Sequence, residues 1–247
     1  LRENTSGINN FIFGKEALQK NINGSNNVAI GENALATGIS SLNNIAIGYH
    51  SLNTNKTGNN NIAVGYNCLR KNTSGDHNVA MGYEALKNNV NGNDNIAWGH
   101  KALQFNTEGN NNIAIGKYSL NNTTSGENNI ALGTESLLNN TEGHNNIAFG
   151  TGALKRNDTG FNNIAMGELS MLSNTGGKNN VGMGIGSLKS NTTGSSNVAM
   201  GVDNLSANTT GTNNVGIGFE SLRNNVSGLN NVASGVQAQF SNRRGNN

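Results

Sequence analysis

The chain has 247 residues with 34 glycines and no proline, and 34% of its residues are hydrophobic. Its formal net charge is only +2 and its lysines and arginines are scattered, which excludes the clustered basic surface that binds nucleic acid. No apolar run is long enough to cross a bilayer, so we expect no membrane insertion by this segment. The single cysteine, Cys68, excludes a disulfide framework within the chain.

A block of five residues, Asn-Ile-Ala-Ile-Gly at 112–116, recurs every 17 residues without an insertion. The consensus repeat is x-x-(A/S)-L-x-x-N-T-x-G-x-N-N-(I/V)-A-(I/M)-G, and we number its positions 1 to 17. The glycine at position 17 occurs in 14 copies: Gly14, Gly31, Gly48, Gly65, Gly82, Gly99, Gly116, Gly133, Gly150, Gly167, Gly184, Gly201, Gly218 and Gly235. The sequence opens in mid-repeat without a secretory signal, so we expect a fragment of a longer protein.

The first predicted element of each repeat is a short strand at positions 3 and 4, where a small residue precedes a leucine, as in Ser119 and Leu120. Glycine and asparagine follow, and these residues tolerate positive φ in tight turns. The asparagines at position 7 are expected to stack into amide ladders. They include Asn106, Asn140, Asn157, Asn174, Asn191 and Asn208.

The second predicted strand covers positions 14 to 16, where the first residue is Ile or Val in 13 of 14 copies and Phe11 is the exception. After it, Gly116 and Gly133 at position 17 are predicted to adopt turn conformations that β-branched residues cannot adopt. Two strands and two turns make one coil, which cannot bury a core alone. The sequence therefore predicts an all-β fold, a parallel β-solenoid of 14 stacked 17-residue coils. Residues 1–247 form a single array, with atypical terminal coils at 1–14 and 235–247.

Both faces of the second strand are restricted to apolar or small residues. Ile113 and Ile115 share one face, whereas Ala114 takes the other, and position 15 is Ala in 11 copies and Gly in two more. One face packs inside the coil and the other most simply packs against another copy of the chain, but the pattern does not tell which face is internal. The predicted repeat core consists of Ile113, Ala114, Ile115, Gly116 and Leu120.

The block N-(I/V)-A-I-G followed by Ala or Ser resembles the N-S-V-A-I-G-x-x-S head repeat of trimeric autotransporter adhesins, over all 14 copies. The longer A-L-x-x-N-T-x-G segment resembles repeats of phage and large-virus tail fibres. The resemblance implies a left-handed β-roll with three chains side by side, hence a homotrimer. The adhesin heads have a shorter coil, and neither a chaperone domain nor a stalk nor a membrane anchor is visible here.

The resemblance implies an extracellular role as a structural or adhesive segment of a surface fibre, on a bacterial cell or a virion. Its expected partners are further copies of itself and a surface polysaccharide or host receptor. The alternative is a purely structural filament subunit without a receptor. A third class, an ice-binding solenoid, would need a flat threonine array, but Lys56, Val90, Asp158 and Val226 interrupt the threonines at position 8.

The sequence does not predict an enzyme, because no pair of acidic residues converges in the way that glycoside hydrolysis requires. Glu84, Glu135 and Glu220 share one repeat position but lie three or more coils apart. The four histidines fall at four different repeat positions, which argues against a shared metal site. We therefore expect neither catalytic residues nor a metal or cofactor.

Position 1 carries aromatic residues on consecutive coils: Tyr49, Tyr66, Tyr83 and then His100. These rings could stack on sugar rings, or they could simply pack on one another across coils. Trp98 occupies the site of Ile115 in its own repeat and is expected in the core, as is the small thiol of Cys68.

Overall fold

The computed structural model describes residues 3–246, and the chain divides into two compact units, Leu1–Ser125 and Gly126–Asn247. Residues 1, 2 and 247, which belong to the predicted terminal coils, lie outside the described residues. Each unit is described by itself below. The prediction of one array over residues 1–247, and the special role of its terminal coils, stay predictions.

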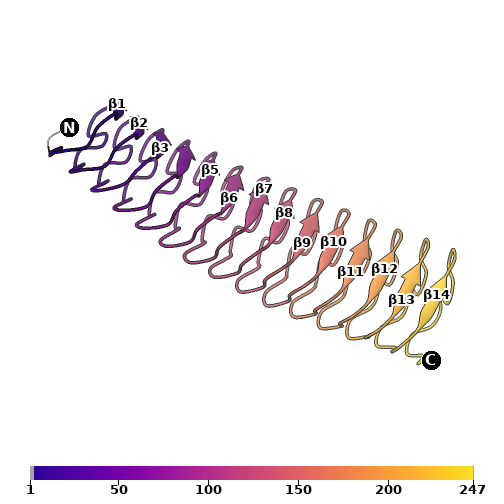
Figure 1. Ribbon diagram of the computed structural model, residues 1–247. Coiled ribbons are helices and arrows are strands. Elements are labelled where there is room, and N and C mark those ends of the chain that lie inside the picture. Colours follow the sequence, from indigo (N-terminus) through magenta and orange to yellow (C-terminus); the bar gives the residue numbers. More distant parts are fainter. Residues whose placement is uncertain (1–2, 247) are drawn as a thin grey trace. The chain divides into compact units, whose positions relative to one another are not determined.

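Each unit contains seven three-residue strands that follow one another in chain order (Figure 1). The strands of the first unit are β1 (Phe11–Phe13), β2 (Val28–Ile30), β3 (Ile45–Ile47), β4 (Ile62–Val64), β5 (Val79–Met81), β6 (Ile96–Trp98) and β7 (Ile113–Ile115). Those of the second unit are β8 (Ile130–Leu132), β9 (Ile147–Phe149), β10 (Ile164–Met166), β11 (Val181–Met183), β12 (Val198–Met200), β13 (Val215–Ile217) and β14 (Val232–Ser234).

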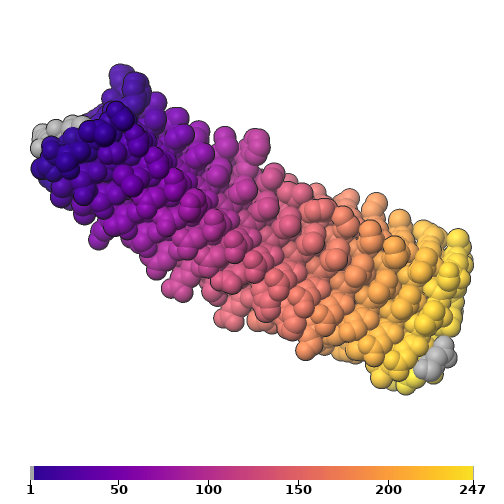
Figure 2. Space-filling view, in the orientation of Figure 1, coloured from indigo at the N-terminus to yellow at the C-terminus, as the bar shows by residue number. Residues whose placement is uncertain are grey.

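Neighbouring strands within each unit pair in parallel with equal repeat positions side by side. Ala46 in β3 lies opposite Ala63 in β4, and Ala199 in β12 lies opposite Gly216 in β13. The space-filling view shows the successive coils of each unit packed directly against one another (Figure 2). The predicted parallel β-solenoid with 17-residue coils is therefore confirmed in both units.

The strand predicted at positions 3 and 4 is wrong. This segment turns instead, because the residues at positions 2 and 4 adopt left-handed backbone conformations; φ is 57° at Glu135 and 50° at Leu137. The backbone still bonds to the next coil, as when the amide of Leu137 donates to the carbonyl of Ala153 at 2.9 Å. A leucine in this conformation costs about 1–2 kcal/mol. Complete burial of its side chain offsets that cost.

The core of each coil is narrow and lies between the inner face of the strand and the turning segment. Alanine at position 15 and leucine at position 4 are fully buried, as in Ala148 and Leu137. Where Gly182 replaces the alanine, an added Cβ would lie 3.0 Å from Ser187 Oγ and 3.1 Å from Met171 Cε. The space behind the strand therefore accepts at most a methyl group beside a leucine.

Two ladders of buried asparagines run along each unit, although Gly38 and Thr123 interrupt the one at position 7 in the first unit. The predicted ladder at position 7 is confirmed: the Nδ2 of Asn174 donates to the Oδ1 of Asn157 at 2.7 Å and to its own coil's Gly177 carbonyl at 3.1 Å. A second ladder, at position 13, links side chains and backbone of successive coils. There the Oδ1 of Asn163 accepts from both the amide and the Nδ2 of Asn180, each at 3.1 Å. These ladders satisfy polar groups that would otherwise be buried without partners.

The block glycines occupy the predicted turns. At Gly116 and Gly133 φ is 134°, a backbone conformation that residues with a side chain rarely adopt. A Cβ added at Gly133 would also lie 2.7 Å from the carbonyl oxygen of Gly150 in the next coil. Glycine is therefore required both by the backbone conformation and by the close approach of neighbouring coils.

Candidate functional site

The outer strand face, which we define as positions 14 and 16, is apolar but not covered by the chain that carries it. The side chains of Ile115, Met200 and Ile217 are 38%, 41% and 44% exposed, whereas the alanines at position 15 between these columns are fully buried. The alanine column is thus the internal face. A coherent apolar sheet face of this kind is rarely left in contact with water.

Only some of the residues that were expected in the core are buried. Ala114 and Leu120 are completely buried, Ile113 is half-buried and Ile115 is exposed on the outer face. The expectation for Trp98 is wrong, since its residue is 58% exposed. The physical reason is room: the inner side of the strand holds only a methyl group, so every large side chain at position 16 points outward.

Position 1, one glycine beyond the strand, is also exposed but differs in kind between the units. In the second unit it is polar in the first three coils, with Thr134, Thr151 and Glu168, and apolar in the later ones, with exposures of 53% at Ile185, 39% at Val202 and 47% at Phe219. In the first unit it carries the aromatic ladder, defined as Tyr49, Tyr66, Tyr83 and His100.

The rings of the aromatic ladder stack on one another. Their centroids are 5.3, 5.1 and 5.2 Å apart in chain order, and the ring planes lie within 10° of parallel. The facing sides of these rings are therefore occupied, and what remains open is chiefly their edges and hydroxyl groups. Cross-coil packing explains the ladder, and stacking of a sugar ring upon its inner faces would require the rings to separate.

Position 2 of the first unit carries a carboxylate held by several donors. Glu84 Oε1 lies 2.7 Å from Lys87 Nζ, while Oε2 accepts from Gln104 Nε2 at 2.7 Å and lies 3.9 Å from Lys101 Nζ. Burial raises the pKa of Glu84, but the hydrogen bond and charge of Lys87, with the charge of Lys101, outweigh it and hold the pKa below its ordinary value.

The equivalent glutamates of the second unit are also paired. Lys155 Nζ lies 2.7 Å from Glu135 Oε2, and Arg223 donates to Glu220 Oε1 at 2.5 Å. The three glutamates at position 2 that the sequence singled out thus bind cations of their own chain. Their geometry provides ion pairs between or within coils and no acid–base pair for hydrolysis.

The threonines at position 8 use their hydroxyl protons internally. Thr175 Oγ1 donates to the carbonyl of Thr192 at 3.2 Å, and Thr192 Oγ1 donates to that of Thr209 at 3.0 Å. Hydroxyl groups engaged with the next coil's backbone hold this turn together. They do not present the free array of donors that ordering of water would use.

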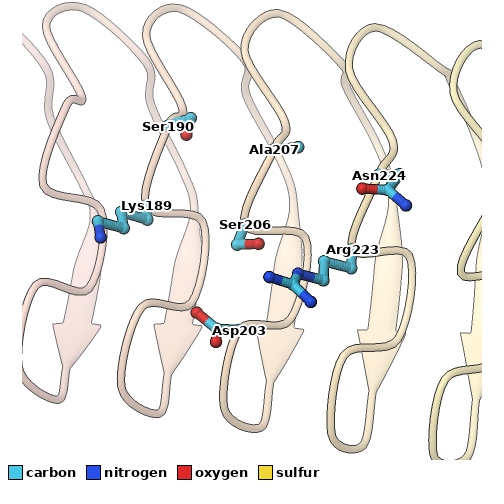
Figure 3. A pocket seen from close by; sticks show the side chains of 7 residues that line it. All are labelled: Lys189, Ser190, Asp203, Ser206, Ala207, Arg223 and Asn224. Atoms are coloured by element: carbon cyan, nitrogen blue, oxygen red, sulfur yellow. The ribbon is translucent and has the colours of Figure 1, made fainter.

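A hollow of about 350 Å³ lies on the second unit (Figure 3). We call it the polar hollow; it is lined by Lys189, Ser190, Asp203, Ser206, Ala207, Arg223 and Asn224. The residues come from positions 2, 5 and 6 of three successive coils. It was not predicted, although a signal existed: residues 206 and 207 form the only pair at positions 5 and 6 in which both side chains are Ser or Ala.

Two further properties concern the residues that the structure describes. Within residues 3–246, no three His, Cys, Asp or Glu side chains come close enough together to hold a metal ion. None of the described segments forms an apolar helix that could span a membrane.

The thiol of Cys68 is buried, as expected, and donates a hydrogen bond to the Gly82 carbonyl at 2.8 Å. Burial raises the pKa of this thiol to about 11.

Comparison with known proteins adds no assignment: the chain matches no protein family and no curated protein. The features that bear on function are therefore the outer strand face, the polar hollow and the repeat itself.

Proposed function

We propose that this chain is a structural and adhesive segment of an extracellular fibre, in which parallel copies associate through their outer strand faces. The observation that carries the proposal is the apolar outer strand face. Ile96, Ile115 and Met200 are more than a third exposed on it, although the same columns are apolar in every coil except at Ser234 in the last strand. A surface that is consistently apolar but uncovered by its own chain indicates a partner with the same repeat.

The size of the face is sufficient for stable association. Each unit has seven strands. Burial of one further aliphatic side chain per coil contributes about 1.5 kcal/mol, hence about 10 kcal/mol of gross stabilisation per unit before the entropy of association is subtracted. In-register copies match because every coil has the same length, so each outer column meets an equivalent column over the whole unit.

The number of chains and the handedness come from the resemblance to adhesin heads and tail fibres, which favours a left-handed roll in a homotrimer. The fibre would stand on a bacterial surface or a virion and contact surface polysaccharide or a host receptor. A purely structural filament subunit is the alternative. A glycan array probed with the assembled protein separates the two, since specific retention requires a binding function.

The assembly is tested by analytical ultracentrifugation and native mass spectrometry at nanomolar concentration. We expect a particle of three times the 25.7 kDa chain mass. The double variant Met200→Glu with Ile217→Glu places two charges on the outer strand face and should yield folded monomers.

The matched control is Thr193→Glu with Thr210→Glu, which adds the same charge at exposed turn positions and should leave the trimer intact. Circular dichroism would verify that both variants keep their fold. A wild-type chain that is monomeric at all concentrations, or an outer-face variant that still assembles, would contradict the proposal.

A further inference from the structure

We propose that the polar hollow of the second unit binds a carboxylated sugar residue of a polysaccharide. This inference deepens the adhesive part of the proposed function and rests on it for the biological source of the ligand. The binding site itself lies within one chain, because all seven lining residues belong to the second unit (Figure 3).

The hollow exists because one coil lacks the long side chains that otherwise cover this edge. Ser206 and Ala207 form its floor, while Lys189 on the preceding coil and Arg223 on the following coil stand on either side (Figure 3). The resulting volume of about 350 Å³ lies near the lower end of the range of small-molecule sites, roughly 300–1,000 Å³. A hollow of this size takes a ligand of one or two rings.

Near Lys189, neither of the two positions that carry a pairing glutamate in other coils is acidic. Three position 5 cations pair with a glutamate: Lys87 and Arg223 with the one three residues earlier, and Lys155 with the one twenty residues earlier. Arg70, which has Asn67 and His50 at these places, forms no such pair within the described residues. At Lys189 these two places are taken by Gly186 and Leu169. Accordingly, Lys189 forms no ion pair with any residue that the structure describes.

The Asp203 carboxylate likewise forms no ion pair with any described residue. Three residues later stands Ser206 instead of a lysine or arginine, and twenty residues later Arg223 is already paired with Glu220 at 2.5 Å. The Asp203 carboxylate lies over Gly186, where an added Cβ would collide with its Oδ1. The glycine therefore leaves the space that the carboxylate occupies, and both oxygens remain available to donors.

The other polar groups of the hollow have free hydrogen-bonding capacity as well. Within the described part of the chain, the hydroxyls of Ser190 and Ser206 and the side-chain amide of Asn224 make no hydrogen bond. Arg223 uses one terminal nitrogen for Glu220, which leaves further N–H donors. Its guanidinium also lies 5.8 Å from the centre of the Phe240 ring, which supports its position.

This set of groups matches the chemistry of an acidic sugar. The ammonium of Lys189 and the remaining donors of Arg223 suit a carboxylate, for which charge-assisted hydrogen bonds are the stronger kind. The Asp203 oxygens accept from ring hydroxyls, while the serines and Asn224 can donate to or accept from others. Apart from the methylene stems of Lys189 and Arg223, the methyl group of Ala207 is the one apolar group among the lining side chains, so a ligand rich in hydroxyl groups fits better than an apolar one.

Binding is tested by calorimetric titration of the full chain with a glucuronic-acid disaccharide and with the neutral glucose disaccharide of the same linkage. We expect saturable binding of the acidic disaccharide at millimolar concentration or better and at least about tenfold weaker binding of the neutral one, because about 1.4 kcal/mol separates tenfold affinities. Equal binding of both sugars, or binding of neither, would overturn the inference.

The variant Ser206→Leu with Ala207→Asn fills the hollow with the pair that residues 138 and 139 already use in the same unit. It should abolish binding without lowering the melting temperature. Ser173→Asn, the matched control, creates the same Leu-Asn pair in a coil outside the hollow and should bind as the natural chain does. Lys189→Gln should reduce the preference for the acidic sugar by about fivefold or more and weaken its dependence on salt.

Retained binding in the filled variant would show that the sugar binds elsewhere and would refute the site. The outer-face variant Met200→Glu with Ile217→Glu separates this inference from the fibre proposal. If it is monomeric and still binds the acidic disaccharide, the site stands alone. If the natural chain proves monomeric yet binds the sugar, the fibre proposal fails and the hollow is upheld.

Discussion

The inner and outer faces of the strands are both restricted, but in different ways. The inner position 15 is fixed in size, because Ala or Gly occupies it in 13 of 14 repeats, and the alanines there are buried against leucine. The outer position 16 is restricted only in polarity: Ile, Val, Leu, Met, Phe or Trp occupies it in 13 of 14 repeats, and Ser234 is the exception. The chain's own packing explains the first restriction. The second needs a surface outside the chain that accepts many apolar shapes.

The largest expected effect comes from breaking the polar part of the interior. Asn163 makes four side-chain hydrogen bonds: its Nδ2 donates to Asn146 Oδ1 and the Gly177 carbonyl, and its Oδ1 accepts two bonds from Asn180. Asn163→Ala leaves these buried partners unsatisfied and should destabilise the chain by about 4 kcal/mol or more. Urea unfolding followed by circular dichroism measures the loss.

The neighbouring Asn162 provides the matched control for this asparagine. It is exposed and makes one side-chain bond, to Asn179, with φ at 55°. Asn162→Gly removes the side chain without straining the backbone and should cost less than about 1 kcal/mol. Similar losses at residues 162 and 163 would show that the buried ladder does not stabilise the coil as described.

A second change compares the two strand faces directly. Ala148→Leu forces three extra carbons into an interior where a methyl group already fills the space, and should destabilise by about 3 kcal/mol. Phe149→Leu, one residue away on the outer face, should change the unfolding free energy of the monomeric outer-face variant by less than about 1 kcal/mol. If the leucine at 148 were tolerated as well as that at 149, the assignment of inner and outer faces would be wrong.

A third prediction concerns how the interior tolerates its rare exceptions. Gly216 faces Asn204: a Cβ added at residue 216 would collide with Asn204 Oδ1 and lie 3.1 Å from Asn204 Cγ. Gly216→Ala should therefore cost about 2 kcal/mol. Asn204→Ser restores the small residue usual at position 3 and should recover most of that loss in the double variant, because the two sites share one space.

The thermodynamic cycle of the four proteins measures this coupling by urea unfolding. Met171 and Gly182 suggest the same compensation, since an added Cβ at residue 182 would lie 3.1 Å from Met171 Cε. Additive effects of the changes at 204 and 216 would mean that the glycine serves another purpose.

These results show which parts of the structure a repeat reveals. The period of 17 residues predicts parallel, in-register pairing, because equal spacing places equal residues side by side. The asparagine ladder at position 7 and the turns at Gly116 and Gly133 follow from residue types with strong local preferences. The conformation of Leu137 could not be predicted in this way, because leucine disfavours positive φ. Burial of its side chain compensates for this unfavourable backbone conformation.

The candidate surfaces were less predictable for a related reason. Alternation along three residues identifies two faces, but only the volume left by Leu137 decides that alanine points inward. The aromatic ladder could be predicted as a column, yet not that its rings would occupy one another's faces. The polar hollow forms because Ser206 and Ala207 have shorter side chains than the residues at the same positions of neighbouring coils. A consensus sequence leaves these variable positions undefined and so does not reveal the hollow.

The smallest predicted effect lies at the edge between the two faces, where Glu84 pairs with Lys87 at 2.7 Å. The pKa of Glu84 is lowered in the folded state, so its contribution to stability is complete above the ordinary carboxyl pKa of about 4.3 and is lost as pH falls through the lower folded value. Glu84→Gln should thus cost about 1 kcal/mol at pH 7, near the upper limit for such pairs, and less at pH 3. Urea unfolding of both proteins at the two pH values measures the difference. Glu108→Gln, at an exposed site that pairs with no cation among the described residues, should leave the pH dependence unchanged. An equal shift in both variants would remove the special role of Glu84.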